Sequence, residues 1–322
     1  MKIAIIDGLN QDMGLKLLFP EADYFINRTQ FDKTTCLQKY NIEIKTDWSI
    51  INDKNYDYLF IIISLYDTKK GTNFYKQEIF EILQKALIII NTNNFKKVFV
   101  FDNYDYDYDP NTLLKNNKIN LFFKRHYNKT KFYPDNVIPF PFIMFGEKAL
   151  IEKTDIDTNI KFCNDENKLN RVFWSGSLYC HTDNEYPCLR NRILTYTQIM
   201  SYSNNHIFNP ERLPYETFIY EMNKSKISLD LLGVGCPNAR TFEILNTNSL
   251  LFREYSNLVW PFPEQFSEET IFKNATEYID KVNILLQNNE LYMKCLINQQ
   301  HIVKKYFNIT WIRNYIYKYL II

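Results

Sequence analysis

The sequence predicts an α/β protein made of two similar units in tandem, each built around a parallel sheet. Short apolar runs of strand length alternate with segments whose apolar residues recur at helical spacing. Strands of this apolar kind are typical of parallel sheets covered by helices on both faces. The series stops in the polar stretch 146–169 and then begins again. The length of 322 residues allows about two domains.

The first half supplies the expected strands of one sheet and at least one helix. The helix follows from the spacing of apolar residues between positions 74 and 87. Polar residues follow several strands, namely Asp7, Asp67 and Asp102. Ligands of parallel sheets bind beyond the carboxyl ends of the strands, so these residues are expected to face a ligand. The expected strands are residues 2–6, 57–65, 97–101, 121–123 and 137–142.

The second half repeats the alternation. Its clearest helix carries apolar residues at helical spacing from Tyr278 to Leu286. Pro214 suits the first turn of another helix. The expected strands are 171–174, 226–232 and 250–252, and the expected helices are 189–200, 214–223, 237–245, 278–286, 290–305 and 310–320.

Composition argues against several classes of protein. The formal net charge is +1, which gives no global field for nucleic acid or anionic membranes. No apolar run approaches the ~20 residues of a membrane span, and Asp7 comes too early for a signal peptide. The six cysteines lack metal-ligand spacing and fit free thiols in a reducing cytosol. We therefore expect a cytoplasmic protein with no transmembrane segment, no nucleic-acid partner and no bound metal.

Glycine is scarce, with only 7 residues, whereas tyrosine (24) and phenylalanine (25) are abundant. Glycine ordinarily makes up about 7% of a chain. An AT-rich genome explains the bias, because glycine codons are GC-rich. The glycines that remain are therefore informative one by one.

The strongest motif is the strand that leads into Gly233-Val234-Gly235 and then into a helix carrying Arg240 and Glu243. Glycines let a backbone approach a ligand closely, and a helix start attracts phosphate. A carboxylate at Glu243 can accept hydrogen bonds from two neighbouring ribose hydroxyls. Together these features predict a nucleotide site, although a simple tight turn is the alternative. The dinucleotide fingerprint is not met, because Asn238 replaces its third glycine.

A second motif ends the strand at 171–174 with Ser175-Gly176-Ser177. The amides and hydroxyls of Gly176 and Ser177 can bind a phosphate, and His181 follows in the same loop. Arg190 and Arg192, farther along, can neutralise a phosphate or simply solvate a helix face.

Residues 171–315 resemble the C-terminal domain of the group 1 glycosyltransferases of the GT-B fold, in the spore-maturation-type branch. The motifs are VFWSGS (172–177), SKISLDLLGVGCPNARTFEIL (225–245) and the helical tail from Tyr278. In the family, a Pro-x-x-Arg-x-Phe-Glu block opens the donor-binding helix, and Arg240 and Glu243 match it here. A weaker match, LFFKRHYN (121–128) with NVIPFPF (136–142), implies that Lys124 and Arg125 lie near the donor.

The resemblance implies two tandem Rossmann-like domains with parallel sheets and an interdomain cleft. Residues 1–145 would form the acceptor-side domain and 146–308 the nucleotide-sugar domain. Residues 309–322 would form a terminal helix that packs back on the first domain. The implied reaction moves a sugar from a UDP- or GDP-linked donor to a hydroxyl of a glycan or other polyol, without cofactor or required metal. The implied donor-binding residues are Gly176, Ser177, Gly233, Gly235, Arg240, Glu243, Lys124, Arg125 and His181.

On the acceptor side we expect Asp7, Asp102 and Tyr104, with Asp102 as the catalytic carboxylate. Two alternatives stay open. Asp105-x-Asp107 is a DxD pattern, which in a metal-dependent glycosyltransferase would hold Mg²⁺ or Mn²⁺. Gly235 also stands where many group 1 enzymes carry a second glutamate, and Asn248-Ser249 where they carry glycine. These departures favour an inactive, glycosyltransferase-like binding protein.

Overall fold

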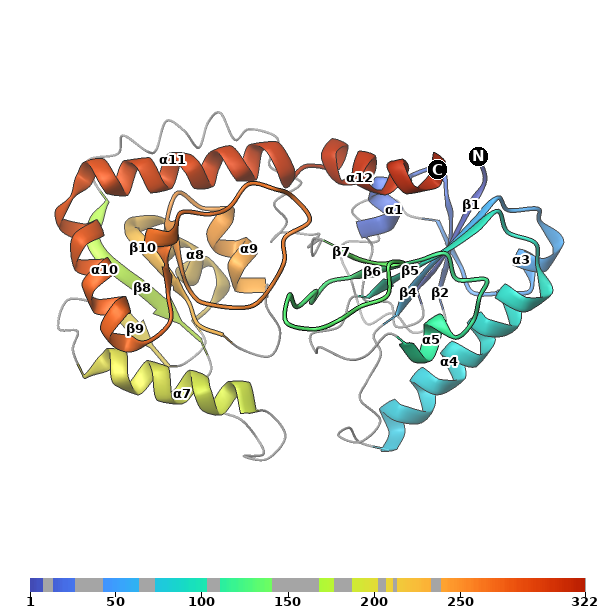
Figure 1. The fold of residues 1–322 in the computed structure, drawn as a ribbon, viewed down its shortest axis with the longest axis horizontal. Coiled ribbons are helices and arrows are strands. Elements are labelled where there is room, and N and C mark those ends of the chain that lie inside the picture. Colours follow the sequence, from blue (N-terminus) through green and yellow to red (C-terminus); the bar gives the residue numbers. More distant parts are fainter. Residues whose placement is uncertain are drawn as a thin grey trace. The chain divides into compact units, whose positions relative to one another are not determined.

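The chain divides into two compact units, each with one parallel sheet (Figure 1). The computed structural model describes residues 1–7, 14–26, 43–63, 73–102, 111–140, 168–176, 187–201, 207–210, 213–232 and 239–321. The first unit comprises Met1–Gly146, Leu258–Pro261 and Ile312–Ile322. The second comprises Glu147–Asn257 and Phe262–Trp311. The predicted α/β class with two parallel sheets is confirmed.

The sheet of the first unit has the strand order β3-β2-β1-β4-β5-β6-β7, and its neighbouring strands pair in parallel. Its strands are β1 (Ile3–Asp7), β2 (Asp23–Ile26), β3 (Ile44–Lys45), β4 (Tyr58–Ile63), β5 (Lys97–Asp102), β6 (Leu121–Lys124) and β7 (Val137–Pro139). Its helices are α1 (Gly14–Leu18), α3 (Ile50–Asp53), α4 (Asn73–Thr92) and α5 (Asn111–Leu114). The chain ends in α12 (Ile309–Ile321), most of which belongs to this unit.

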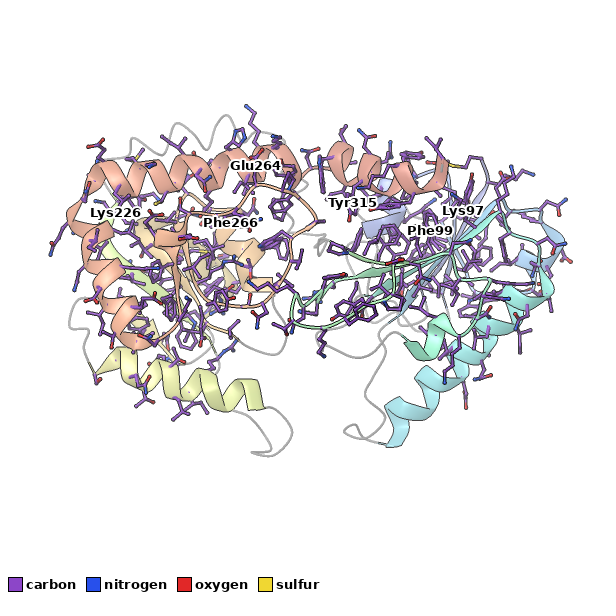
Figure 2. The ribbon with its side chains drawn as sticks, viewed as in Figure 1. Lys97, Phe99, Lys226, Glu264, Phe266 and Tyr315 are labelled. Atoms are coloured by element: carbon purple, nitrogen blue, oxygen red, sulfur yellow. The ribbon has the colours of Figure 1, made fainter. Side chains whose placement is uncertain are left out.

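The two faces of this sheet bury different side chains. One face packs aliphatic strand residues against Ile82, Ala86 and Ile89 of α4. The other face is aromatic: the rings of Phe101 and Phe123 stack with centroids 4.5 Å apart. α12 covers this aromatic face. Its Tyr315 hydroxyl donates to the Pro139 carbonyl at 2.7 Å, and the Lys97 Nζ donates to the Tyr319 carbonyl at 2.8 Å (Figure 2).

The sheet of the second unit has the order β12-β11-β10-β8-β9 and is also paired in parallel. Its strands are β8 (Leu169–Ser175), β9 (Ile207–Asn209), β10 (Ser225–Asp230), β11 (Leu250–Glu254) and β12 (Ile271–Phe272). Its helices are α7 (Pro187–Met200), α8 (Tyr215–Lys224), α9 (Ala239–Leu245), α10 (Ala275–Gln287) and α11 (Asn289–Tyr306), and residues Glu268–Thr270 form a 3-10 turn, η2.

Each sheet has a point where the strand order reverses. In the first unit the chain builds outward from β1 to β3 and then returns to add β4 on the other side of β1. In the second unit it builds from β8 to β9 and then adds β10 on the other side of β8. Crossover connections leave the sheet in opposite directions at such a switch point, which opens a crevice beyond the strand ends. The switch points therefore predict where ligands bind.

Short strands account for most differences from the sequence expectations. β2, β3, β9 and β12 were not expected, because runs of two to four residues carry too little periodicity to detect. β10 ends at Asp230, earlier than the expected 226–232, because the main chain of residues 231–232 bonds to side chains instead. The described helices include none with the length and apolar character that a membrane crossing requires.

Gln299 completes the hydrogen bonding of β11 where β12 is too short to reach. β12 pairs only with Arg253 and Glu254. Earlier on the strand, the Leu251 amide donates to Gln299 Oε1 at 2.7 Å, and Gln299 Nε2 donates to the Ser249 carbonyl at 3.0 Å. The Gln299 side chain is buried on α11. One side-chain amide thus takes the place of a neighbouring strand.

We expect Gln299→Leu to lower the free energy of unfolding of the second unit by about 2 kcal/mol or more. The substitution leaves a buried amide and a buried carbonyl unsatisfied, at a cost of about 1–3 kcal/mol each. Gln287→Leu, at an exposed position on α10, is the matched control. Chemical denaturation followed by circular dichroism measures both. Equal stability of the two variants would contradict the strand-replacing role.

Candidate functional site

The switch point of the second unit lies between the carboxyl ends of β8 and β10. β8 ends at Ser175 and is followed by Gly176, whose amide donates to the Asn209 carbonyl at the end of β9 at 3.0 Å. β10 ends at Asp230. The structure describes three of the predicted donor-binding residues of this unit, Gly176, Arg240 and Glu243. Gly176 belongs to this edge, and α9 carries the other two.

Arg240 lies directly against Gly176. A Cβ atom at position 176 would stand 2.9 Å from Arg240 Nη1 and 3.2 Å from the Trp174 ring. Glycine is therefore the residue that permits this approach. The guanidinium carbon lies 5.1 Å from the Phe218 ring centroid and 5.7 Å from that of Trp174, within cation–π range. Two aromatic rings thus hold a permanent positive charge at the switch point.

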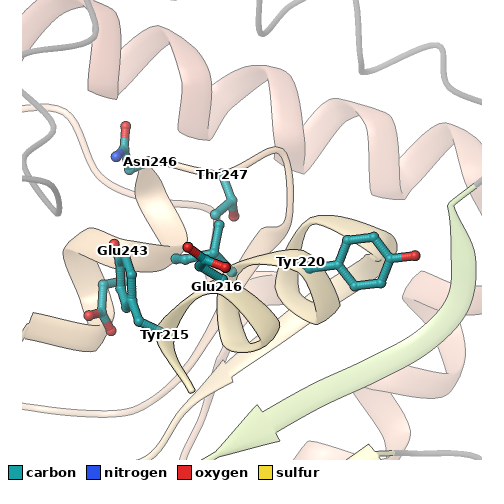
Figure 3. A pocket seen from close by; sticks show the side chains of 7 residues that line it. Tyr215, Glu216, Tyr220, Glu243, Asn246 and Thr247 are labelled. Carbon is teal, nitrogen blue, oxygen red and sulfur yellow. The ribbon is translucent and has the colours of Figure 1, made fainter. Parts of the chain in front are cut away.

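Glu243 follows Arg240 by three residues, so the two side chains leave the same side of α9. Glu243 is buried and lines a pocket of about 350 Å³ between α8 and α9. Figure 3 shows Glu243 beside Tyr215 at one end of this pocket, while Tyr220 lies toward the other end. The full lining is Tyr215, Glu216, Ile219, Tyr220, Glu243, Asn246 and Thr247. A carboxylate and an aromatic ring therefore share a pocket one helical turn from Arg240.

Asp230 lies beneath α9. Thr241 Oγ1 donates to Asp230 Oδ2 at 2.6 Å, which ties the first turn of α9 to the end of β10. Burial of the carboxyl raises its pKa above the ordinary value of 3.8. The Thr241 hydrogen bond and the charges of Arg240, Arg192 and Arg253 act in the opposite direction but do not outweigh burial. The site thus contains a carboxyl whose ionisation is disfavoured in the folded protein.

The first unit collects a second group of predicted residues at the carboxyl ends of its strands. Asp7 ends β1 and accepts a hydrogen bond from the Tyr24 hydroxyl. Asp102 ends β5 beside Lys124 of β6, with Lys124 Nζ 3.3 Å from Asp102 Oδ2. Both of these side chains are fully buried. Arg125 is also buried, so the two basic residues expected near the donor lie inside this unit.

Five predicted site residues lie outside the described part of the chain: Ser177, His181, Gly233, Gly235 and Tyr104. The DxD residues Asp105 and Asp107 lie outside it as well. Among the residues that the structure describes, no group of three or more His, Cys, Asp or Glu side chains could hold a metal ion.

Sequence reasoning missed Tyr215 and Glu216 of the pocket, Asp230, and Glu254 at the end of β11. It left Arg192 undecided, and the structure places its guanidinium on the carbonyls of Leu231 and Leu232. One signal was available: Asp230 is the only acidic residue within the expected strand 226–232. Nothing in the sequence places Tyr215 next to Glu243, because the pocket forms only when α8 and α9 pack side by side.

No protein-family model matches the sequence, and the search of curated proteins gives no match. Among solved structures, Anabaena HepE in complex with UDP-glucose is 11% identical, aligns over 99% of each chain and has a TM-score of 0.58. HepE in complex with UDP gives a TM-score of 0.57 at the same identity and coverage. The T4 phage BGT in complex with UDP and Mn²⁺ is 13% identical over 99% of each chain, with a TM-score of 0.49.

The chain has the GT-B fold. This confirms the fold that the motifs at 172–177 and 225–245 implied. Membership of the spore-maturation-type branch stays a prediction. Each of the two parallel sheets has a switch point, and polar residues lie at the strand ends beside it.

We expect the stability of wild type relative to Asp230→Asn to fall as the pH rises from about 3 toward neutrality. The folded-state pKa of Asp230 is raised, so its stabilising contribution is complete below the unfolded-state value of about 3.9 and is lost as pH rises through the folded-state value. Unfolding of both proteins at a series of pH values measures the difference. Thr241→Val removes an opposing hydrogen bond and should steepen the trend. If the stability of wild type relative to Asp230→Asn instead rose with pH, the arginine charges would outweigh burial in setting the pKa of Asp230.

Proposed function

We propose that this GT-B chain is a glycosyltransferase that moves a sugar from a nucleotide diphosphate to an acceptor hydroxyl, with the second unit binding the donor. The observation that carries the proposal is the arrangement of Gly176, Arg240 and Glu243 around one switch point. A solved chain of the same fold, HepE, contains UDP-glucose, so uridine nucleotides are the first donors to test.

We propose that different residues of the site bind different parts of the donor. Glu243 would accept hydrogen bonds from the two ribose hydroxyls, for which its two carboxylate oxygens are suited. Tyr215, in the same pocket, would pack against the nucleoside. Arg240, one turn away on α9, would bind the diphosphate, because a guanidinium offers paired donors to phosphate oxygens.

Transfer breaks the bond between the sugar carbon and the diphosphate oxygen, so negative charge grows on the leaving group. A fixed cation accelerates this step because it needs no reorganisation as the charge develops. Phe218 and Trp174 fix the Arg240 guanidinium in this way. We therefore propose a reaction that requires no metal. Activity that disappears on chelation and returns with Mn²⁺ would instead support the DxD alternative at Asp105 and Asp107.

On the acceptor side, we propose that Asp102 takes the proton of the attacking hydroxyl, with Asp7 on the same edge of the sheet. Lys124 holds the Asp102 carboxylate at the end of its strand. The acceptor would be a glycan or other polyol rather than nucleic acid, since the net charge of +1 offers no general attraction to phosphodiesters. A cytoplasmic setting suits the buried free thiol of Cys295.

We expect calorimetry to show UDP binding that weakens by about 10- to 100-fold in Glu243→Ala, as loss of a charged hydrogen-bond acceptor predicts. 2′-Deoxy-UDP should bind wild type more weakly than UDP does, and Glu243→Ala should no longer distinguish the two nucleotides. Glu290→Ala, in the first turn of α11, is the control.

Binding of neither UDP nor GDP to wild type would refute the donor site. Binding without hydrolysis or transfer of any nucleotide sugar would favour the inactive, binding-protein alternative. Hydrolysis of the donor by water is a useful first readout, because it does not require knowledge of the acceptor.

We expect Gly176→Ala to weaken UDP binding by about 10-fold, comparable to loss of one charged contact, with little change in melting temperature. The new methyl group would meet the far end of the Arg240 side chain at 2.9 Å, which can move without disturbing the backbone, and the Trp174 ring at 3.2 Å, which needs to give by only a few tenths of an ångström. In an Arg240→Ala background the same substitution should therefore have almost no further effect on UDP affinity. Independent, additive losses would show that Gly176 does not act through Arg240.

A further inference from the structure

Two oppositely charged side chains, those of Arg192 and Glu254, bind the main chain just after β10 ends. The register of β10 with β11 ends at the pair Asp230 and Arg253. Two residues later, the Leu232 amide donates to Glu254 Oε2 at 3.0 Å. The Leu232 carbonyl accepts from Arg192 Nε at 2.9 Å. The amide and the carbonyl of Leu232 are thus each bound by a charged side chain.

The same two side chains reach further. Arg192 Nη2 donates to the Leu231 carbonyl at 3.2 Å, so the guanidinium spans two successive carbonyls. The second carboxylate oxygen of Glu254 accepts from Thr195 Oγ1 at 3.2 Å. Thr195 and Arg192 lie three residues apart on α7 and therefore share a helix face. Glu254 belongs to β11. α7 and β11 consequently hold the exit of β10 from two sides.

This arrangement differs from an ordinary surface ion pair. Leu231 is buried and Leu232 and Glu254 are half-buried, so these hydrogen bonds are shielded from water. Hydrogen bonds in which one partner is ionised are stronger than neutral ones, and both charged partners here are anchored in regular elements. The strand exit is therefore fixed more firmly than a solvated turn.

We propose that Arg192 and Glu254 are positioning residues for the donor: they fix the main chain at the end of β10, and with it the edge that the nucleotide contacts. The inference rests on the proposed donor site in the second unit. Neither residue needs to touch the nucleotide. Their effect passes through Leu231 and Leu232, in the way that supporting residues hold a binding site within its productive geometry.

The test compares Glu254→Ala, Glu254→Gln and Arg192→Gln with wild type in the full-length chain. Glu254→Gln keeps an oxygen that can accept from the Leu232 amide, whereas Glu254→Ala does not. Glu221→Ala is the matched control, because Glu221 pairs with Arg171 near the start of β8, at the other end of the same sheet. The readouts are UDP affinity by calorimetry, hydrogen exchange of the Leu232 amide, and melting temperature.

A misplacement of about 1 Å can lower a reaction rate by about 100-fold, and for the less demanding step of binding we expect roughly a 10-fold loss of UDP affinity in Glu254→Ala and Arg192→Gln. Glu254→Gln should recover most of that affinity and slow the exchange of the Leu232 amide relative to Glu254→Ala. The double variant should lose no more affinity than the worse single variant, since both act on the same two peptide groups.

UDP affinity in Glu254→Ala equal to that of Glu221→Ala would overturn the positioning role while leaving the donor site intact. Additive losses in the double variant would overturn it as well. Absence of nucleotide binding by wild type would instead refute the proposed function, and the positioning role with it.

Discussion

The parallel pairing of β8 with β10 is the constraint on which the second unit depends. Because β9 was added first on one side of β8, the chain must cross over before β10 can pair on the other. The crossover places α8 next to α9 and brings the ends of both central strands to a common edge. Gly176 is far in the sequence from Arg240 and Glu243, and this one pairing brings all three residues to the same edge.

The charges at that edge are supported by atoms that are not charged. Arg240 rests on aromatic rings, Asp230 on a threonine hydroxyl, and Glu254 on an amide and another threonine. These uncharged partners fix where the side chains lie, while neighbouring charges act on the same carboxyls: Arg192, Arg240 and Arg253 on Asp230, and Arg192 on Glu254. In the first unit the support is itself charged, since Lys124 pairs directly with Asp102.

Much of the fold could be predicted from the sequence, because strands such as 97–101 and helices such as 278–286 carry strong apolar patterns. Two-residue strands such as β3 and β12 could not, since their existence depends on a neighbour with which to pair. For the site, Glu243 and Gly176 follow from local motifs. Tyr215, Arg192 and Glu254 do not, because their contacts join residues more than 20 positions apart, and no local spacing records them.

The replacement of a strand by Gln299 has a consequence for association with other chains. An open stretch of β11 beside the short β12 would present an amide and a carbonyl to any extended peptide, the usual route to edge-to-edge aggregation. A fixed side-chain amide occupies both groups, and the helix that carries it blocks the approach. The sheet can therefore be short on that side, and still remain closed to strands from a neighbouring molecule.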